Sequence, residues 1–457
     1  MRLVTPEIEI DENDPFKNDK LNRKPFAESL LSLITNVEDN LVISLDASWG
    51  DGKTTFVKMW QGFLKSSGVK SLYFDAFAND SFEDPFMALV SSIDLLIEKE
   101  FFDKPTAMKK LNEFKDKAVR VGTKLLSWGA KIGVKAITLN VIKDKDIEQL
   151  KEIAEDIASD AGESTSKFVE DKLNSYKEVL GAKDEFTNKL NELAEEAYKE
   201  TRKPLVLIID ELDRCKPTYA LELIEKVKHL FSVKRIVYVL VMHTTQLEES
   251  VKCVYGQNID ARTYMQKFIN IECKLPKNTM SVYENDYVKY CAALCDLHGL
   301  DESDRLVKMM ELLGKVFKLS MRDLQRCFTN IVLTKAAGQG RFFEPDLVSL
   351  IIVLKVKKPD IYDRLKTNRI AFKKLWDELE LDGLVQAQGD IKRKNRLSML
   401  LRTYLLPDVE FSGLDDQSDE KECWRNRSYD FDLEDRTQVL PYFCGLIESF
   451  KFLQEEI

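Results

Sequence analysis

A glycine-rich stretch lies between an apolar run and a helical pattern, and its residue types could bind a phosphate chain. Residues 47–55 read Ala-Ser-Trp-Gly-Asp-Gly-Lys-Thr-Thr and follow the apolar residues 41–45. Glycines let backbone N–H groups converge on a polyphosphate, and the helix N-terminus behind them adds partial positive charge. We therefore predict that this loop binds nucleotide phosphates through Ser48, Trp49, Gly50, Asp51, Gly52, Lys53, Thr54 and Thr55.

Two side chains at the end of the loop have separate predicted roles. Lys53 would reach the β- and γ-phosphates, and the Thr54 hydroxyl would ligate Mg²⁺. One residue departs from the usual glycine-first pattern, because Ala47 stands at its first position. Alanine is small but restricts a backbone with positive φ, so its effect on the rate of hydrolysis is left open.

An apolar run that ends in two carboxylates supplies the second half of this chemistry. Residues 205–209 are Leu-Val-Leu-Ile-Ile, and Asp210 and Glu211 follow them. Asp210 would bind Mg²⁺, and Glu211 would orient or deprotonate a water. Together with the loop, the pair predicts binding of a nucleoside triphosphate and its hydrolysis. His243 ends another apolar run and is a candidate contact for the γ-phosphate or the water; a hydrogen-bonded structural histidine is the alternative.

Five apolar runs alternate with helical patterns, at residues 41–45, 71–77, 205–209, 235–242 and 268–276. This alternation predicts an α/β fold, with a mostly parallel five-stranded sheet covered on both faces. The loop and the two carboxylates would meet at the carboxyl edge of that sheet. The glutamate next to Asp210 favours the additional-strand branch of P-loop proteins. The NKxD element with which GTPases read their base is missing, so ATP is favoured over GTP.

Composition and pattern divide the chain into four parts. We expect a polar leader at 1–18, a nucleotide-binding core at 19–276 with a helical insert at about 100–203, a helical lid at 277–345 and a C-terminal helical domain at 346–457. Residues 21–23 would pack near the nucleotide base or simply begin a helix. The segment 412–422 is acidic and polar, which favours a loop.

Charge and cysteine content exclude some functions. The formal net charge is -10, which argues against a general nucleic-acid binder, and we interpret the basic run 392–396 as a solvated helix face. Eight cysteines follow residue 214 without a signal peptide, which favours reduced thiols in the cytoplasm. Three potential metal ligands, Cys291, Cys295 and His298, lack a fourth and are interpreted as core and surface residues.

The relatively apolar segment 121–142 inside the insert could contact a membrane. It carries Lys124, Lys131 and Lys135, and each lysine at the centre of a span costs about 2.5–3.5 kcal/mol. This cost argues against a transmembrane helix. A helix packed on its own domain is favoured, and an amphipathic helix on a membrane surface or partner is the alternative. We therefore expect a cytoplasmic protein, with contact to the inner face of the membrane left open.

These motifs together resemble the KAP family of P-loop NTPases, which includes bacterial phage-exclusion proteins and animal membrane-scaffold proteins. The similar segments are residues 49–55, 73–77, 209–217, 246–251, 255–256, 264–269 and 322–326. The resemblance implies that Asp210 binds Mg²⁺ and that Arg322, with Arg326 as alternate, contacts the γ-phosphate from the lid. It also implies that Lys267 approaches the nucleotide of a neighbouring subunit, so we expect self-association or a protein partner through the Lys267/Arg262 region and the insert.

Two functions from different classes follow from these observations. The first is a Mg²⁺-dependent ATPase that works as a conformational switch; the family resemblance suggests the ATPase component of a bacterial antiphage system with partner proteins. The alternative is a scaffold that holds nucleotide without hydrolysing it and binds a partner or the membrane surface. A DNA-translocating motor is disfavoured by the net charge and by the lack of a recognisable DNA-binding module.

Overall fold

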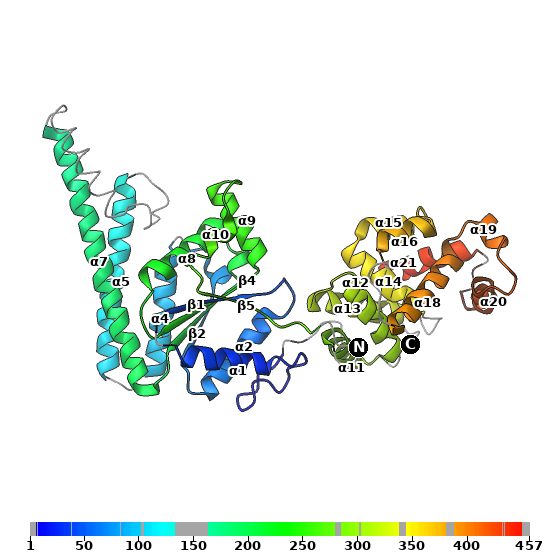
Figure 1. Ribbon diagram of the computed structural model, residues 1–457, viewed down its shortest axis with the longest axis horizontal. Coiled ribbons are helices and arrows are strands. Elements are labelled where there is room, and N and C mark those ends of the chain that lie inside the picture. Colours follow the sequence, from blue (N-terminus) through cyan, green and yellow to red (C-terminus); the bar gives the residue numbers. More distant parts are fainter. Residues whose placement is uncertain are drawn as a thin grey trace, which may run out of the picture.

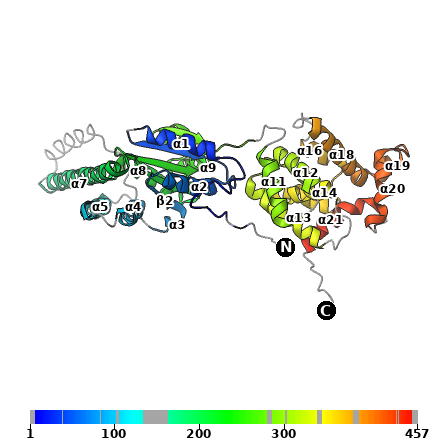
Figure 2. The same cartoon turned by 90° about the horizontal axis from the view of Figure 1, so that it is seen from below.

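The computed structural model describes residue 6 and residues 8–449, except 38, 83, 102–104, 133–162, 279–284, 301–302, 338–343, 381–387, 432 and 434. Figures 1 and 2 show an α/β domain between two helical parts. On one side lies a two-helix arm made of α5 (Pro105–Ile132) and α7 (Glu163–Thr201). On the other side lies a body whose described secondary-structure elements are all helices.

The α/β domain is built on the five-stranded parallel sheet that the apolar runs predict. Its strands are β1 (Leu41–Asp46), β2 (Ser71–Asp75), β3 (Leu205–Asp210), β4 (Ile236–Met242) and β5 (Ile271–Lys274). They lie in the order β2-β3-β4-β1-β5, and every neighbouring pair is parallel. The loop after β1 therefore starts between the ends of β4 and β5, at the carboxyl edge of the sheet. The fifth strand is shorter than the predicted run 268–276.

Both faces of the sheet are buried, which explains why its strands are continuous apolar runs. Val237, Val239 and Val241 of β4 pack on the side of α1 (Lys24–Thr35) and α2 (Lys53–Ser66). Tyr238 and Leu240, on alternate positions, face the opposite side. That side is covered by α4 (Pro85–Phe101), α8 (Pro217–Leu230), α9 (Thr244–Tyr255), α10 (Ala261–Met265) and the arm. The short helix α3 (Ala76–Asn79) follows β2 directly.

The arm packs on its own domain through aromatic side chains. Phe186 of α7 lies 5.2 Å from the rings of Phe114 and Phe86 and 5.3 Å from that of Phe231, measured between ring centroids. Of the apolar segment 121–142, only the part up to Ile132 belongs to the described residues. Within the ranges that the structure describes, no helix has the length and apolar character needed to span a membrane.

The helical body has a single hydrophobic core. The helices of this body are α11 (Asp286–His298), α12 (Ser303–Val316), α13 (Met321–Ala337), α14 (Pro345–Lys357), α15 (Pro359–Lys366), α16 (Phe372–Leu379), α18 (Gln388–Leu405), α19 (Asp408–Ser412), α20 (Asp419–Phe431) and α21 (Val439–Ser449). The core runs from Tyr287 to Ile447, and α14 is buried at its centre. The boundary predicted at 345/346 therefore does not separate two cores.

The structure describes two segments of this body that were predicted to lie on its surface, 392–396 and 412–422. In the basic run 392–396, Arg393 pairs with Asp390 at 2.5 Å and Arg396 with Asp346 at 2.8 Å. These arginines are therefore engaged by carboxylates of the body itself. The loop expected at 412–422 is partly wrong, because α20 already begins at Asp419. Its first turn is acidic, and acidic side chains stabilise a helix N-terminus.

Candidate functional site

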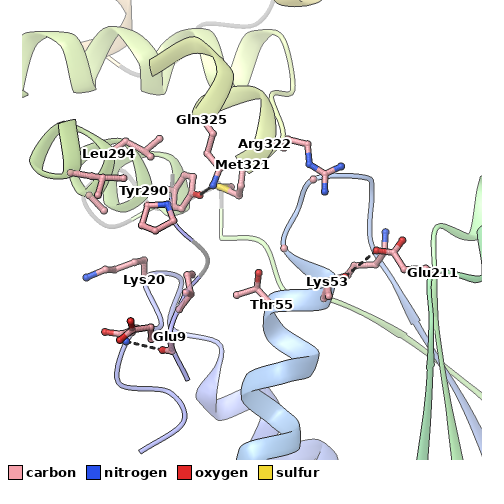
Figure 3. Close-up of a pocket in the computed structure, with 18 of the residues that line it drawn as sticks. Glu9, Lys20, Lys53, Thr55, Glu211, Tyr290, Leu294, Met321, Arg322 and Gln325 are labelled. Carbon is pink, nitrogen blue, oxygen red and sulfur yellow. Dashed lines mark hydrogen bonds between the residues drawn. The ribbon is translucent and has the colours of Figure 1, made fainter. Parts of the chain in front are cut away.

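A cavity of about 950 Å³ lies where the loop after β1 faces the helical body. Its size is typical of a small-molecule site. Four parts of the chain contribute side chains: the leader, the loop with the start of α2, the turn after β3, and the helices α11 and α13 (Figure 3). The lining residues are Pro6, Ile8, Glu9, Asn18, Lys20, Gly50, Gly52, Lys53, Thr54, Thr55, Glu211, Arg214, Tyr290, Ala293, Leu294, Leu297, Met321, Arg322 and Gln325.

The loop takes its shape from two glycines and one lysine. Gly50 and Gly52 have φ of 84° and 81°, in the region that side chains disfavour. Ala47 does not have positive φ, so an alanine fits the first position of the loop. The Lys53 ammonium donates to the carbonyl of Ala47 at 2.7 Å and to that of Ser48 at 3.5 Å. Lys53, at the start of α2, thus reaches back to the first residue of the loop.

Asp210 ends β3 as a buried carboxylate. It accepts hydrogen bonds from the Glu211 backbone N–H at 2.8 Å and from the Tyr73 hydroxyl at 3.1 Å. Burial raises its pKa, although these hydrogen bonds and one from Thr54 act in the opposite direction. A buried carboxylate beside a threonine hydroxyl is a favourable place for a cation.

Glu211 has a strained backbone and two polar partners. Its φ of 63° lies in the left-handed region, which is costly for a non-glycine residue and has to be held by the surrounding structure. Its carboxylate accepts from the Thr54 hydroxyl at 3.2 Å and from Arg214 Nε at 2.7 Å. Burial and the neighbouring Asp210 raise the pKa of Glu211, and Arg214 opposes that shift. Thr54 therefore contacts the residue predicted to activate water.

His243 lies beside the loop and outside the described lining of the cavity. Its backbone N–H donates to Asp213 at 3.0 Å. Asp213, in the 3-10 turn η1 (Leu212–Arg214), also accepts from the indole N–H of Trp49. The Trp49 and His243 rings meet edge to face at 5.6 Å between centroids. In this arrangement the histidine side chain contacts the loop tryptophan, so its predicted contact with the γ-phosphate or water remains a prediction.

The helical body touches the loop through α13 and the chain before α11. The backbone N–H of Arg322 donates to the Gly50 carbonyl at 3.1 Å, and Lys277 pairs with the Asp51 carboxylate at 3.1 Å. Figure 3 shows the Arg322 side chain above the loop. Arg326, the alternate, is exposed one turn further along α13 and is not part of the described lining.

The residues predicted to approach a neighbouring subunit lie apart from the cavity lining. Arg262 pairs with Glu272 at 2.7 Å, and the Lys267 ammonium lies 5.3 Å from the centre of the Tyr264 ring. Both side chains are exposed.

Sequence reasoning missed two walls of the cavity. The leader contributes Ile8 and Glu9 although its sequence shows no periodic pattern, and Lys20 follows shortly after it. Helix α11 contributes Tyr290 and Leu294. Its residues Cys291, Cys295 and His298, interpreted from the sequence as core and surface residues, are all buried in the body. The described residues contain no group of three metal-binding side chains. The helical periodicity of α11 could have separated its two faces.

The residues fit Mg²⁺ beside a phosphate chain. Thr54 offers a hydroxyl and Asp210 a buried carboxylate, both oxygen donors of the kind this ion takes. Mg²⁺ is usually held by one or two carboxylates and by substrate phosphates, so a site with few protein ligands is the expected form.

A parallel sheet whose first strand leads into this loop, with an acidic pair at the end of β3, is the architecture of a P-loop NTPase. The sequence agrees: a family model described as "KAP family P-loop domain" matches residues 23–337. The chain therefore belongs to the KAP family of P-loop NTPases.

Other comparisons add little. No curated protein matches the chain. Among solved structures, the chain is similar to "Structure of the Aeropyrum Pernix ORC2 protein (ADPNP-ADP complexes)", with 14% identity, 98% of this chain and 96% of that chain covered, and a TM-score of 0.31. A TM-score this low carries no argument about function.

Proposed function

We propose that this protein binds ATP with Mg²⁺, hydrolyses it, and changes conformation in doing so. The observation that carries the proposal is that Lys53, Glu211 and Arg322, which are far apart in sequence, line one cavity. A phosphate-binding loop, a water-activating carboxylate and a cation opposite them are the parts that phosphoryl transfer to water requires.

Each residue has a role that follows from its place. Lys53 and the backbone N–H groups of the loop bind the phosphates, and Thr54 and Asp210 would hold Mg²⁺. The chemistry that Mg²⁺ supplies when bound is neutralisation of charge on the phosphate oxygens. Glu211 orients the attacking water and accepts its proton. Arg322 stabilises the charge that develops on the γ-phosphate.

The switch follows from the contacts between the loop and the helical body. Gly50 and Asp51 belong to the phosphate-binding loop, and each is bonded to a residue outside the α/β domain, Arg322 and Lys277. A change in the loop on binding or hydrolysis therefore reaches the body directly. Family resemblance supports a further proposal, that this switch serves an antiphage system in the cytoplasm with partner proteins. Lys267, Arg262 and the arm are the proposed contact surfaces.

Two variants test the ATPase. Lys53→Ala should abolish ATP binding in calorimetry, and Glu211→Gln should keep binding while phosphate release stops. Lys58→Ala, on an exposed face of the same helix, is the matched control and should behave like the unchanged chain. Unchanged phosphate release by Glu211→Gln would remove the role given to Glu211. An unchanged chain that binds ATP but releases no phosphate, even with partner proteins, would support the scaffold instead.

A further inference from the structure

Arg23 lies buried behind the phosphate-binding loop, just before α1. Only 5% of the residue is exposed. Its guanidinium donates to the carbonyl of Asp51 at 2.9 Å through Nη2 and to that of Gly52 at 3.4 Å through Nη1. Sequence analysis placed residues 21–23 near the base or at a helix entry. The helix entry is confirmed, because α1 begins at Lys24, and Arg23 is in addition bonded to the backbone of the loop.

These two bonds help to fix where the loop N–H groups point, and the Gly52 carbonyl also accepts from the backbone N–H of Phe56 at 3.0 Å. In a planar trans peptide, the C=O and the N–H of one unit point in opposite directions, and the described part of the chain has no cis peptide. When the carbonyls of Asp51 and Gly52 are directed back to Arg23, the N–H groups of Gly52 and Lys53 must point the other way. Gly52 and Lys53 both line the cavity.

Arg23 is itself held in place by its surroundings. Its backbone N–H donates to the Asp19 carboxylate at 2.5 Å. Burial lowers the pKa of Arg23, and the nearby carboxylates of Asp286, Asp19 and Asp51 oppose that shift. A guanidinium is charged at any physiological pH, so a fixed cation lies directly behind the loop. Gly52 leaves room for it, because a Cβ there would lie 3.2 Å from Nη1 of Arg23.

We infer that Arg23 is a positioning residue for the polyphosphate: it turns the loop N–H groups into the cavity and adds positive charge behind them. The inference rests on the proposed function. It names the feature of the substrate that the loop recognises, which is a diphosphate or triphosphate chain. The single phosphate of AMP would be positioned by the base and ribose. Its binding would therefore depend little on a loop whose N–H groups are arranged for the β-phosphate.

The test compares nucleotides that differ only in phosphate number. Binding of ATP, ADP and AMP to the full chain is measured by calorimetry with Mg²⁺ present, for the unchanged protein, Arg23→Met, Arg23→Lys and Lys24→Met. Lys24 is the exposed neighbour of Arg23 and serves as the matched control. Hydrogen bonds to a charged group contribute about 1.5–3 kcal/mol. Arg23→Met should therefore weaken ATP and ADP binding by about tenfold or more and leave AMP binding unchanged.

The remaining variants separate positioning from folding. Arg23→Lys keeps the charge but loses the two-pronged contact, so its affinity for ADP should fall between those of Arg23→Met and the unchanged chain. Lys24→Met should bind like the unchanged chain. Equal ADP affinity in Arg23→Met and the unchanged chain would overturn the inference, as would an equal loss for all three nucleotides. If the unchanged chain bound none of them, the proposed function itself would fail.

Discussion

The carbonyl oxygen of Gly50 accepts a hydrogen bond from the backbone N–H of Arg322 at 3.1 Å. This bond joins the middle of the phosphate-binding loop to the first turn of α13, across 272 positions of sequence. Arg322 is therefore placed over the loop by its own main chain, independently of where its side chain points. The relationship makes several features of the site testable.

Gly50→Ala should disrupt this junction. Gly50 has a φ of 84°, and a Cβ there would lie 2.7 Å from both the Cβ of Arg322 and the hydroxyl oxygen of Ser320. The added methyl group must push α13 away from the loop, so we expect phosphate release to fall by about tenfold or more, a loss of at least about 1.4 kcal/mol. Gly181→Ala in α7 is the control, because a Cβ added at Gly181 would meet no neighbouring atom within 4 Å. Equal rates for both variants would contradict the expectation.

Arg322→Gln should slow hydrolysis more than it weakens ATP binding. The arginine is proposed to stabilise charge that develops in the transition state, and loss of one such group costs about 10²–10³-fold in kcat. Steady-state phosphate release against ATP concentration gives kcat and KM separately. Arg326→Gln is the matched control on the same helix, and it should match the unchanged chain. If Arg326→Gln lost activity instead, the alternate assignment would be right.

Tyr73→Phe should raise the Mg²⁺ concentration that is needed for phosphate release. The Tyr73 hydroxyl donates to Asp210 at 3.1 Å and helps to fix this carboxylate. One such hydrogen bond contributes about 1 kcal/mol, so the Mg²⁺ concentration for half-maximal phosphate release should rise roughly fivefold. Titration of Mg²⁺ at saturating ATP measures this. An unchanged midpoint would show that Tyr73 does not help to hold the metal ligand.

Asp323→Asn should destabilise the helical body in a pH-dependent way. Asp323 accepts from the backbone and hydroxyl of Ser320, at 3.0 and 2.8 Å, and pairs with Lys357 at 2.6 Å. Burial acts to raise the pKa of Asp323, but these partners outweigh it and the pKa is lowered. A lowered pKa means that the stabilisation is present above the pKa of the unfolded chain, about 3.9, and is lost as the pH falls through the folded value.

The measurement is urea denaturation of both proteins at several pH values. At pH 7 the variant should unfold with a free energy lower by about 1–2 kcal/mol. The difference should persist down to about pH 5 and narrow below about pH 4. A difference that did not change with pH would mean that the charge of Asp323 contributes nothing.

The sheet and the acidic pair were predictable because their signals are local. A buried parallel strand is a continuous apolar run, and Asp210 and Glu211 stand at the end of one. The loop was predictable because its glycines and Lys53 are contiguous. The structure also explains why Ala47 is compatible with the loop, since the positive φ values fall at Gly50 and Gly52.

The rest of the site depends on contacts that leave no local pattern. Arg23 meets the loop 28 residues later, and Tyr290 lines the cavity from a helix whose sequence drew attention to its buried cysteines. Tertiary packing determines which polar residues of the leader face the cavity, so the sequence of the leader alone does not identify them. The common core of lid and C-terminal helices was hidden for the same reason, because prolines mark helix ends without showing which helices pack together.

The shared core of the helical body has a mechanical consequence. Arg322 lies on α13, and α13 shares the core of the helical body with α20, which lies at the far end of the body (Figure 1). Close-packed interiors resist deformation, so a rotation that begins at the Gly50 junction carries the whole body with it. Displacement grows with distance from the pivot. In the switch proposed above, the body would therefore work as a lever arm, so that the loss of one phosphate would move most the surface furthest from the cavity.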